Sequence, residues 1–203
     1  MYRFHPLESV VDERRRVRQQ IREARRQLSQ TQQQAASDNI VQRVADAAHL
    51  ASASKVALYL ANDGELNPQP LIDWYWANGT QVYLPVLHPF SSGNLLFLRY
   101  TPNTTMVENC FGISEPKLDI RLLESKSELD IIYTPLVAFD ANGNRIGMGG
   151  GFYDRTLSPW RHGLGPRPVG LAHNCQQLPA IPTDHWDIPL PELLTPDQHW
   201  HFS

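Results

Sequence analysis

The chain is most apolar over the stretch Leu129-Asp130-Ile131-Ile132-Tyr133-Thr134-Pro135-Leu136-Val137-Ala138-Phe139. A run of this length, rich in β-branched and aromatic residues, predicts a buried central strand that Pro135 interrupts. A glycine-rich sequence follows soon after it, Asn144-Arg145-Ile146-Gly147-Met148-Gly149-Gly150-Gly151-Phe152-Tyr153-Asp154-Arg155. A short helix is expected over residues 151–157, so the glycines would join the strand region to a helix.

Further strands are expected on both sides of this region, over residues 55–60, 81–86, 94–100, 168–172 and 187–195, with 94–100 nearer an edge. Helices are expected over residues 13–28, 33–50 and 68–78, where apolar residues recur at helical spacing. Strands that alternate with helices predict an α/β fold, a three-layer α/β/α sandwich with a Rossmann-like, mostly parallel sheet. The length predicts a single domain, residues 1–203, on which an amino-terminal basic helix within residues 1–30 packs.

The composition is that of an ordinary globular protein. A net charge of −3 with 41% hydrophobic residues does not favour a general binder of polyanions. Residues 1–11 lack the apolar core of a signal peptide, and no window approaches the ~18 uninterrupted apolar residues of a membrane span. Cys110 and Cys175 share no CxxC spacing, which favours the reducing cytoplasm over a disulfide or a zinc site.

The glycine-rich sequence has the features of an anion-binding loop. Its glycines permit positive φ angles and close approach of the backbone to a ligand, so that successive amides and a helix dipole converge on an anion. Arg145 and Arg155 flank the loop and can supply positive charge for phosphate oxygens. Asp154 would repel phosphate unless a Mg²⁺ ion lies between the two groups.

Other readings of the loop exist. It could be a tight turn whose glycines serve packing alone. It is not a dinucleotide fingerprint, because Phe152 stands where GxGxxG needs its last glycine, and it is not a Walker loop, because no Gly-Lys-Ser/Thr follows. The residues therefore predict a phosphate loop of another kind, in an enzyme or in a protein that binds a phosphate ligand without turnover.

The first predicted helix carries two stripes. The apolar stripe consists of Val17, Ile21, Ala24 and Leu28. The basic stripe lies about 100° around the helix axis from it and consists of Arg14, Arg18, Arg22 and Arg25. The basic stripe could be a solvated helix face, the usual place of a charge run. It could also contact nucleic acid, although it lacks interleaved aromatic residues and a recognisable module.

These motifs resemble the signature of the 5-formyltetrahydrofolate cyclo-ligase family, also called 5,10-methenyltetrahydrofolate synthetases. The resemblance spans residues 18–195 and includes, in order, the segments 18–29, 60–66, 83–86, 113–116, 130–140 and the glycine loop, which is the specific element. It implies an ATP-dependent ligase of one-carbon folate metabolism. The γ-phosphoryl of ATP would activate the formyl oxygen of 5-formyltetrahydrofolate, and ring closure would give 5,10-methenyltetrahydrofolate, ADP and phosphate.

The resemblance also implies roles for residues of this chain. ATP would contact Arg18, Arg22, Arg145, Ile146, Gly147, Met148, Gly149, Gly150, Gly151, Phe152, Tyr153 and Asp154. The folate, with or without a polyglutamate tail, would contact Leu60, Glu65, Met148, Gly149, Gly150, Gly151 and Phe152. Arg145 and Tyr153 would be catalytic, and Asp154 and Asp187 would bind Mg²⁺. The expected partner is this small molecule alone, with no nucleic acid and no membrane, and the expected state is a monomer.

The chain departs from the family's pattern at three places. Arg18 stands where the family often has lysine, and Gly150 where some members have lysine. Trp186 separates His185 from Asp187, whereas the family commonly has His-Asp adjacent. Neutralisation of phosphate is therefore expected to depend more on Arg145 and the helix arginines. None of the eight histidines is expected to pair with a carboxylate at metal-ligand spacing, and the tryptophans are expected in the core or a lid.

Overall fold

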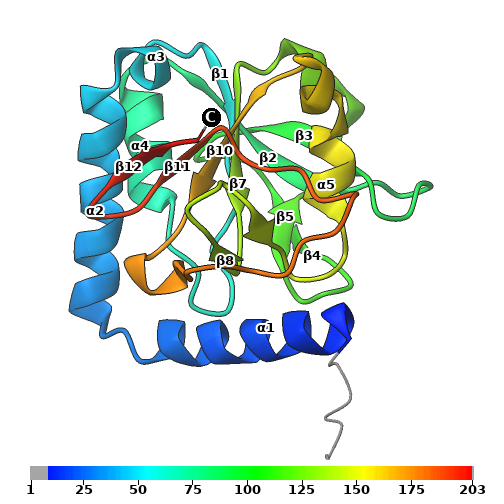
Figure 1. Ribbon diagram of the computed structural model, residues 1–203. Coiled ribbons are helices and arrows are strands. Elements are labelled where there is room, and N and C mark those ends of the chain that lie inside the picture. The colour runs from blue at the N-terminus through cyan, green and yellow to red at the C-terminus, as the bar shows by residue number, and fades with distance from the viewer. Residues whose placement is uncertain (1–8, 203) are drawn as a thin grey trace, which may run out of the picture.

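A computed structural model describes residues 9–202 of the chain (Figure 1). Its centre is an eight-stranded sheet in the order β12-β11-β10-β7-β1-β2-β3-β6. Neighbours from β11 to β2 pair in parallel, whereas β12, β3 and β6 are antiparallel to their neighbours. The strands are β1 (Lys55–Ala57), β2 (Gln81–Leu87), β3 (Leu95–Tyr100), β6 (Leu123–Glu124), β7 (Ile131–Pro135), β10 (Arg167–Leu171), β11 (Glu192–Leu194) and β12 (His199–His201).

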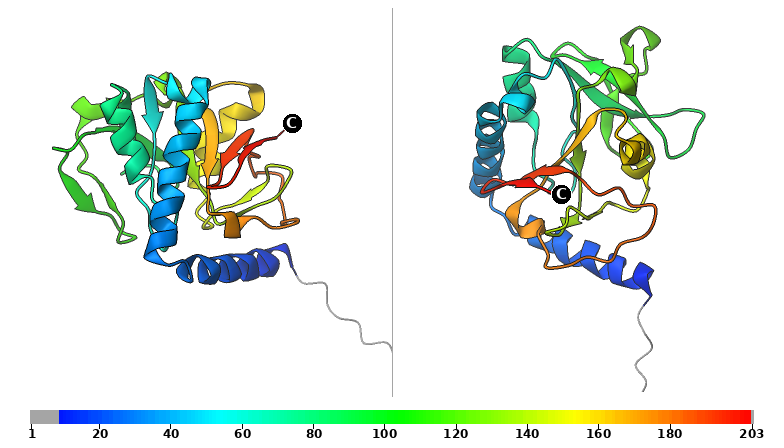
Figure 2. Two further views of the ribbon diagram at one scale, coloured as in Figure 1. Left: turned by 90° about the vertical axis from the view of Figure 1, so that its left-hand side faces the viewer. Right: turned by 45° about the horizontal axis from the view of Figure 1, so that its top comes forward.

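Helices cover both faces of the sheet, as Figures 1 and 2 show. One layer contains α2 (Gln30–Asp46), α3 (Ala48–Ala51) and α4 (Gln69–Ala77), and the other contains α5 (Phe152–Leu157) and the 3-10 helix η3 (Ser158–His162). The helix α1 (Val10–Arg26) lies across one edge of the sheet. Three further 3-10 turns are η1 (Ile120–Leu122), η2 (Lys126–Glu128) and η4 (Asn174–Gln176). The predicted α/β fold with a mostly parallel sheet is confirmed.

Burial on both faces explains why the central strands are almost continuously apolar. In β7, Ile131 and Tyr133 pack in the core beneath α2 and α4, whereas Ile132 packs in the core on the α5 side. Val56 and Ala57 of β1 divide in the same way. Successive side chains of a strand point to opposite faces, so both layers receive apolar contacts from β7 and from β1.

The prediction of a central strand within residues 129–139 that is interrupted at Pro135 is confirmed, because β7 lies in the middle of the sheet and ends at that residue. The strand β7 ends at Pro135, and β8 (Ala138–Phe139) pairs with β9 (Arg145–Ile146) in a separate two-stranded sheet. Proline has no N–H to donate, so Pro135 removes one ladder hydrogen bond at the point where the strand ends. Asp140 closes the β8–β9 turn by accepting hydrogen bonds from the amides of Asn142 and Asn144 at 2.9 and 3.2 Å.

Other boundaries differ from expectation. The helix predicted over residues 33–50 divides at Ala47 (φ −100, ψ 97) into α2 and α3. The strand predicted over residues 55–60 is shorter, because β1 ends at Ala57. A second small sheet, β4 (Met106–Glu108) with β5 (Ser114–Pro116), has no counterpart in the sequence prediction.

The arginine stripe of α1 is turned toward the body of the protein, so its interpretation as a solvated face is wrong. Arg14, Arg18 and Arg22 are half-buried, and Arg25 is fully buried. The apolar stripe beside it packs on the β8–β9 hairpin, where Ile21 contacts a cluster made of Val137, Ala138, Ile146 and Ile181. The hairpin and the helix therefore hold each other beside the glycine loop.

Two further expectations can be compared with the structure. Cys110 and Cys175 are both free thiols, as the sequence predicts. Among residues 9–202, no helix combines the length and the apolar character that crossing a bilayer would require.

Candidate active site

The candidate site lies at the edge where the parallel strands have their carboxyl ends. The turn after β1 reaches this edge, as do the β8–β9 hairpin after β7 and the segment after β10. The helix α1 crosses the same edge and contacts both β8 and η4 (Figure 1). Ligands of open parallel sheets bind at this edge, because the loops that leave neighbouring strands meet there.

The glycine loop has the backbone geometry of an anion cradle. Gly149 and Gly151 have φ angles of +106° and +65°, which favour glycine. At Gly150 a Cβ atom would lie 2.7 Å from the Phe152 ring. Within residues 9–202, the N–H groups of residues 148–151 donate no hydrogen bond to a protein acceptor. Amides in a tight loop without protein acceptors are available to a bound anion.

Two arginines hold this loop from opposite sides. Arg18 donates from Nε to the Gly147 carbonyl at 2.8 Å, and its guanidinium lies against Gly149. Arg155 donates from Nε to the Gly93 carbonyl at 2.7 Å and from its terminal nitrogen to the Gly150 carbonyl. Positive charge therefore lies on both sides of Gly150, where some relatives are expected to carry lysine.

Arg145 lies beneath the loop and is only 3% exposed. Its terminal nitrogen donates to Oδ1 of Asp154 at 2.6 Å. Burial lowers the pKa of Arg145, and the charges of Asp154 and Asp187 oppose that shift. A buried guanidinium with a partner of this kind remains charged and fixed in position.

The two predicted metal ligands lie in the same part of the site, and each has an arginine partner. Asp187 accepts hydrogen bonds at Oδ2 from Arg14 at 2.5 Å and from the Asp184 amide at 2.7 Å. Asp154 also accepts a 3.4 Å hydrogen bond from the Ile188 amide at Oδ1. In the described part of the chain, the other oxygen of each carboxylate accepts no hydrogen bond.

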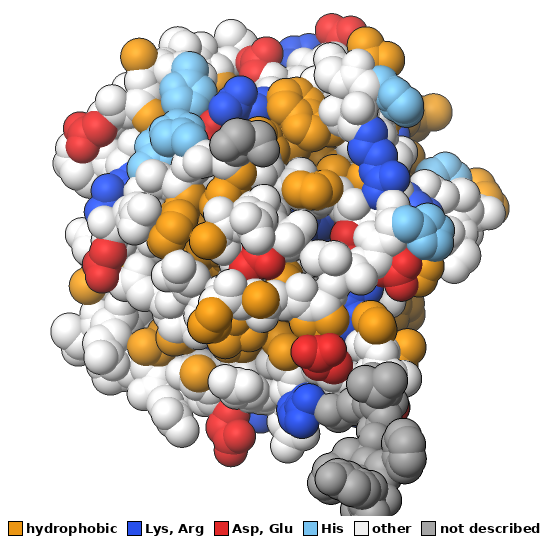
Figure 3. All heavy atoms as spheres, viewed as in Figure 1, with side chains coloured by type: hydrophobic (Ala, Val, Ile, Leu, Met, Phe, Trp, Pro, Cys, Tyr) orange, Lys and Arg blue, Asp and Glu red, His pale blue; other side chains and the backbone are white. Residues whose placement is uncertain are grey.

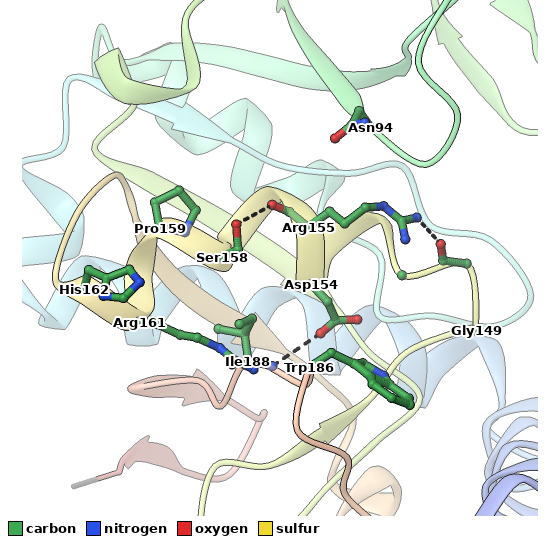
Figure 4. A pocket seen from close by; sticks show the side chains of 12 residues that line it. Asn94, Gly149, Asp154, Arg155, Ser158, Pro159, Arg161, His162, Trp186 and Ile188 are labelled. Atoms are coloured by element: carbon green, nitrogen blue, oxygen red, sulfur yellow. Dashed lines mark hydrogen bonds between the residues drawn. The ribbon is translucent and has the colours of Figure 1, made fainter.

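A cleft of about 830 Å³ opens beside the loop (Figure 4). Its lining comes from residues Asn94, Gly149, Gly150, Gly151, Asp154, Arg155, Ser158, Pro159, Arg161, His162, Trp186 and Ile188. Arg161 donates to the carbonyls of His185 and Asp187 at 2.6 and 2.7 Å and so fixes the segment that carries Trp186. Trp186 is 52% exposed, which agrees with the expectation of a lid better than with that of a core residue.

The second half of the site is the turn after β1. Arg22, Arg25 and Arg26 all pair with Asp63, Arg26 at 2.7 Å and Arg25 at 3.4 Å. Burial alone would raise the pKa of Asp63, but the pairs with Arg22 and Arg26 outweigh it and hold the pKa below its ordinary value. Arg22 of α1 therefore contacts the turn after β1, whereas Arg18 of the same helix contacts the glycine loop. Leu60 is half-buried against the main core.

Glu65 closes this turn by accepting a hydrogen bond from the Asn62 amide at 3.1 Å. Burial raises the pKa of Glu65 to about 7. The pKa of the Tyr153 hydroxyl is also raised, mainly by burial and then by the charge of Glu65, while Arg145 opposes the shift. Tyr153 therefore lies within the electrostatic reach of both halves of the site.

His173 is a site residue that sequence reasoning missed. It is buried, it follows β10 by two residues, and burial and the charge of Arg25 lower its pKa to about 4. Among the described residues its Nε2 atom has no hydrogen-bond partner. Asp63 and Arg161 were missed as well. The position of His173 just after a parallel strand and the Asn-Asp-Gly sequence around Asp63 were the available signals.

Comparison with known proteins identifies the family of this chain. The model of the 5-formyltetrahydrofolate cyclo-ligase family matches residues 10–196. The 5-formyltetrahydrofolate cyclo-ligase of Escherichia coli K12 is 50% identical over 182 residues, which are 90% of this chain and 100% of that protein. The Haemophilus influenzae protein of the same name is 48% identical over 91% of this chain and 98% of its own length. The solved 5,10-methenyltetrahydrofolate synthetase of Aquifex aeolicus has a TM-score of 0.78 at 27% identity, covering 93% of this chain and 92% of that one. The chain belongs to the 5-formyltetrahydrofolate cyclo-ligase family.

Proposed function

We propose that this chain converts 5-formyltetrahydrofolate to 5,10-methenyltetrahydrofolate, with transfer of the γ-phosphoryl of ATP to the formyl oxygen and release of ADP and phosphate. The observation that carries the proposal is the glycine loop, whose amides lack protein acceptors among the described residues and whose flanks are Arg18 and Arg155. Family membership supports the choice of substrate. We further propose a monomer that acts in the cytoplasm, where the free thiols of Cys110 and Cys175 would be stable.

The reaction divides a difficult substitution into two easier steps. The formyl oxygen attacks the γ-phosphorus of ATP, the bond to ADP breaks, and the formyl carbon becomes electrophilic. A neighbouring folate amine then attacks that carbon and loses its proton. Phosphate departs with the former formyl oxygen, and the new C–N bond closes the ring. Such a path needs positioning and stabilisation of charge, and it needs no covalent enzyme intermediate.

The glycine-loop half is suited to the triphosphate. Loop amides can donate to phosphate oxygens, and Arg18 and Arg155 lie on either side of them. Arg145 supplies a third positive charge from below, in a position fixed by its burial and by Asp154. Fixed positive groups that meet the developing charge need no reorganisation during phosphoryl transfer, which is where their catalytic benefit arises.

The turn half is suited to the folate. Glu65 is a carboxyl with a pKa of about 7, so it can donate or accept hydrogen bonds to the polar edge of a pterin near neutral pH. Leu60 offers an apolar contact beside it. Tyr153 would bring the folate's formyl group toward Arg145, because its hydroxyl lies within the electrostatic reach of both Glu65 and Arg145.

Asp154 and Asp187 fit a Mg²⁺ ion in their donor chemistry, since Mg²⁺ prefers carboxylate and phosphate oxygens. Within residues 9–202 each carboxylate has one oxygen that accepts no hydrogen bond, both lie within electrostatic reach of Arg145, and Asp154 lines the cleft. The ion would neutralise phosphate oxygens of the nucleotide when it is bound. The arginine partners of both carboxylates lie ready to contact the same phosphates.

A direct assay tests this function. Purified protein with 5-formyltetrahydrofolate, ATP and Mg²⁺ should show growing methenyl-folate absorbance together with one ADP for each product, and neither signal without ATP. A protein that binds both ligands yet releases no ADP would instead be a binding protein on this scaffold, and the proposed activity would be wrong.

A further inference from the structure

A cluster of histidines around a buried carboxylate lies outside the candidate active site. Glu192 in β11 is 0% exposed, and its Oε1 atom lies 2.9 Å from Nε2 of His49 and 2.6 Å from Nε2 of His199. His49 belongs to α3 and His199 to β12. The expectation that no histidine lies with a carboxylate at metal-ligand spacing is therefore wrong. The partners are 143 and 7 positions apart, so only the fold brings them together.

The three ligand atoms converge on one point. The two Nε2 atoms and a Glu192 oxygen all lie within 4.8 Å of one another. A tetrahedral ion bound at 2.0–2.1 Å needs its ligand atoms about 3.3 Å apart. Each histidine nitrogen would therefore have to move away from Oε1 by only about half an ångström from its present 2.9 or 2.6 Å. His49 is half-exposed and lies on a four-residue helix, and its side chain can make that movement.

The surroundings of the cluster resemble the second shell of a metal centre. Arg167 donates to Oε2 of Glu192 at 2.6 Å and fixes the carboxylate, while both histidines approach Oε1 and His49 also lies 3.2 Å from Oε2. Arg43 of α2 donates to the Pro196 carbonyl at 2.9 Å and ties the helix layer to the β11–β12 turn. Groups that hold the ligand side chains in place lower the free energy needed to order those side chains when an ion binds.

A hollow of about 310 Å³ opens beside the cluster, so a fourth ligand can reach it. Its lining is Arg43, Asp46, Ala47, His49, His199 and His201. Figure 3 shows histidine side chains gathered at the upper left of the molecule, over the region where Figure 1 places α3 and β12. Three protein ligands with a solvent-accessible fourth position is a recurrent arrangement for zinc.

We propose that His49, Glu192 and His199 bind one first-row divalent cation of the zinc class, with water as the fourth ligand. Two imidazoles and one carboxylate favour Zn²⁺ over Mg²⁺ or Ca²⁺, which prefer sets made of oxygen alone. The cation would join the helix layer to the carboxyl-terminal hairpin β11–β12. These elements contribute none of the residues lining the active-site cleft, so the site would stabilise the fold rather than take part in catalysis.

Zinc titration of the untagged, full-length protein tests the proposal. With a chromophoric chelator as competitor, the wild-type protein should bind one Zn²⁺, and both His49→Ala and His199→Ala should weaken binding by about 100-fold or more. Cobalt should give the intense visible bands of a tetrahedral site in the wild-type protein alone. Zinc should also raise the Tm of the wild-type protein and leave that of His199→Ala unchanged.

His201→Ala is the matched control. Its ring lies 4.2 Å from that of His199, yet none of its atoms belongs to the ligand set. This variant should bind zinc within about threefold of the wild-type affinity. Equal affinity in the wild-type protein and His49→Ala would overturn the proposal, and so would a loss in His201→Ala as large as that in His199→Ala. His49 is half-exposed, so its replacement should leave the fold intact.

Discussion

The two halves of the candidate site use charge in opposite ways. The glycine-loop half presents Arg18 and Arg155 on either side of the loop, and even its buried Arg145 keeps a carboxylate partner. The turn half buries Glu65 and His173 under conditions that disfavour their charged forms. The first half therefore matches a polyanion, and the second matches a ring system with neutral polar groups. The difference would let two parts of one site favour ligands of different charge, a triphosphate beside the glycine loop and a folate beside the turn after β1.

The largest effect is expected for Asp154→Asn. The change leaves Arg145 buried without its anionic partner and removes a predicted metal ligand. We expect kcat/KM to fall by about 100-fold or more, as when one fixed electrostatic group is lost from a phosphoryl-transfer site. Steady-state rates from the methenyl-folate absorbance provide the measurement.

Asp119→Asn is the control for this prediction. Asp119 pairs with Arg121 at 2.6 Å on the exposed surface, and such pairs contribute little. Its rate should stay within about twofold of the wild-type value. Full activity in Asp154→Asn would contradict both roles proposed for this carboxylate, as the partner of Arg145 and as a metal ligand.

The second test compares two glycines of one loop. A Cβ atom at Gly149 would have to adopt a φ of +106°, whereas Gly147 has no positive φ and its nearest neighbour atom would lie at 3.7 Å. Strain of ~1–3 kcal/mol should raise the KM for ATP in Gly149→Ala by roughly 10- to 100-fold. Gly147→Ala should stay near the wild-type value. Equal effects in the two variants would mean that backbone conformation at Gly149 does not shape the phosphate site.

The third test addresses the turn half. Glu65→Gln keeps the shape of the side chain but cannot ionise, so the KM for 5-formyltetrahydrofolate should rise about tenfold while the KM for ATP stays nearly constant. The pH profile of kcat/KM for the folate should lose an ionisation near pH 7. A rise in the KM for ATP alone would contradict the proposal that Glu65 contacts the folate, and would assign it to the ATP-binding half of the site.

The same variant tests stability against pH. The pKa of Glu65 is raised from 4.5 to about 7, so the folded state binds this proton more tightly than the unfolded state. The resulting stabilisation is complete below pH 4.5 and is lost as the pH rises through about 7. Urea unfolding at pH 5 and pH 8 should therefore show a smaller loss of unfolding free energy with pH in Glu65→Gln than in the wild-type protein.

The smallest expected effect on KM distinguishes two arginines that pair with Asp63. Arg22 pairs with Asp63 from a half-buried position, whereas Arg26 pairs with it from the exposed side of α1. Arg22→Ala should raise the KM for the folate about threefold, and Arg26→Ala should change neither KM beyond about twofold. A larger effect of Arg22→Ala on the KM for ATP would favour the role implied by family resemblance and would weaken the division into two halves.

The sequence was sufficient for the parts of the molecule that local rules govern. Apolar runs and helical spacing gave the order of strands and helices, and four glycines beside Arg145 gave the position of the loop. It was insufficient where a local pattern has two solutions. The run over residues 129–139 is apolar except at Asp130 and Thr134, and it divides between β7 and β8, because apolar character does not determine which strand a segment pairs with.

Long-range pairs were outside the reach of sequence reasoning. The basic stripe of α1 reads as a solvated face until Asp63 and Asp187 are placed opposite its arginines. His173 has no motif around it, and its importance comes from burial beside Arg25. Each of these features depends on segments far apart in the chain that only the folded sheet brings together.

The arginine partners of Asp154 and Asp187 have a consequence for the order of events at the site. Without nucleotide, each carboxylate already has a cationic counter-ion, Arg145 or Arg14, so a free divalent ion must compete with a guanidinium. A bound triphosphate would offer those arginines another anion and would free the carboxylates for the ion. Counter-ion exchange of this kind makes the two affinities reciprocal, so each ligand should tighten the binding of the other by the same factor. Magnesium should therefore bind weakly to the free protein and much more tightly when nucleotide is present.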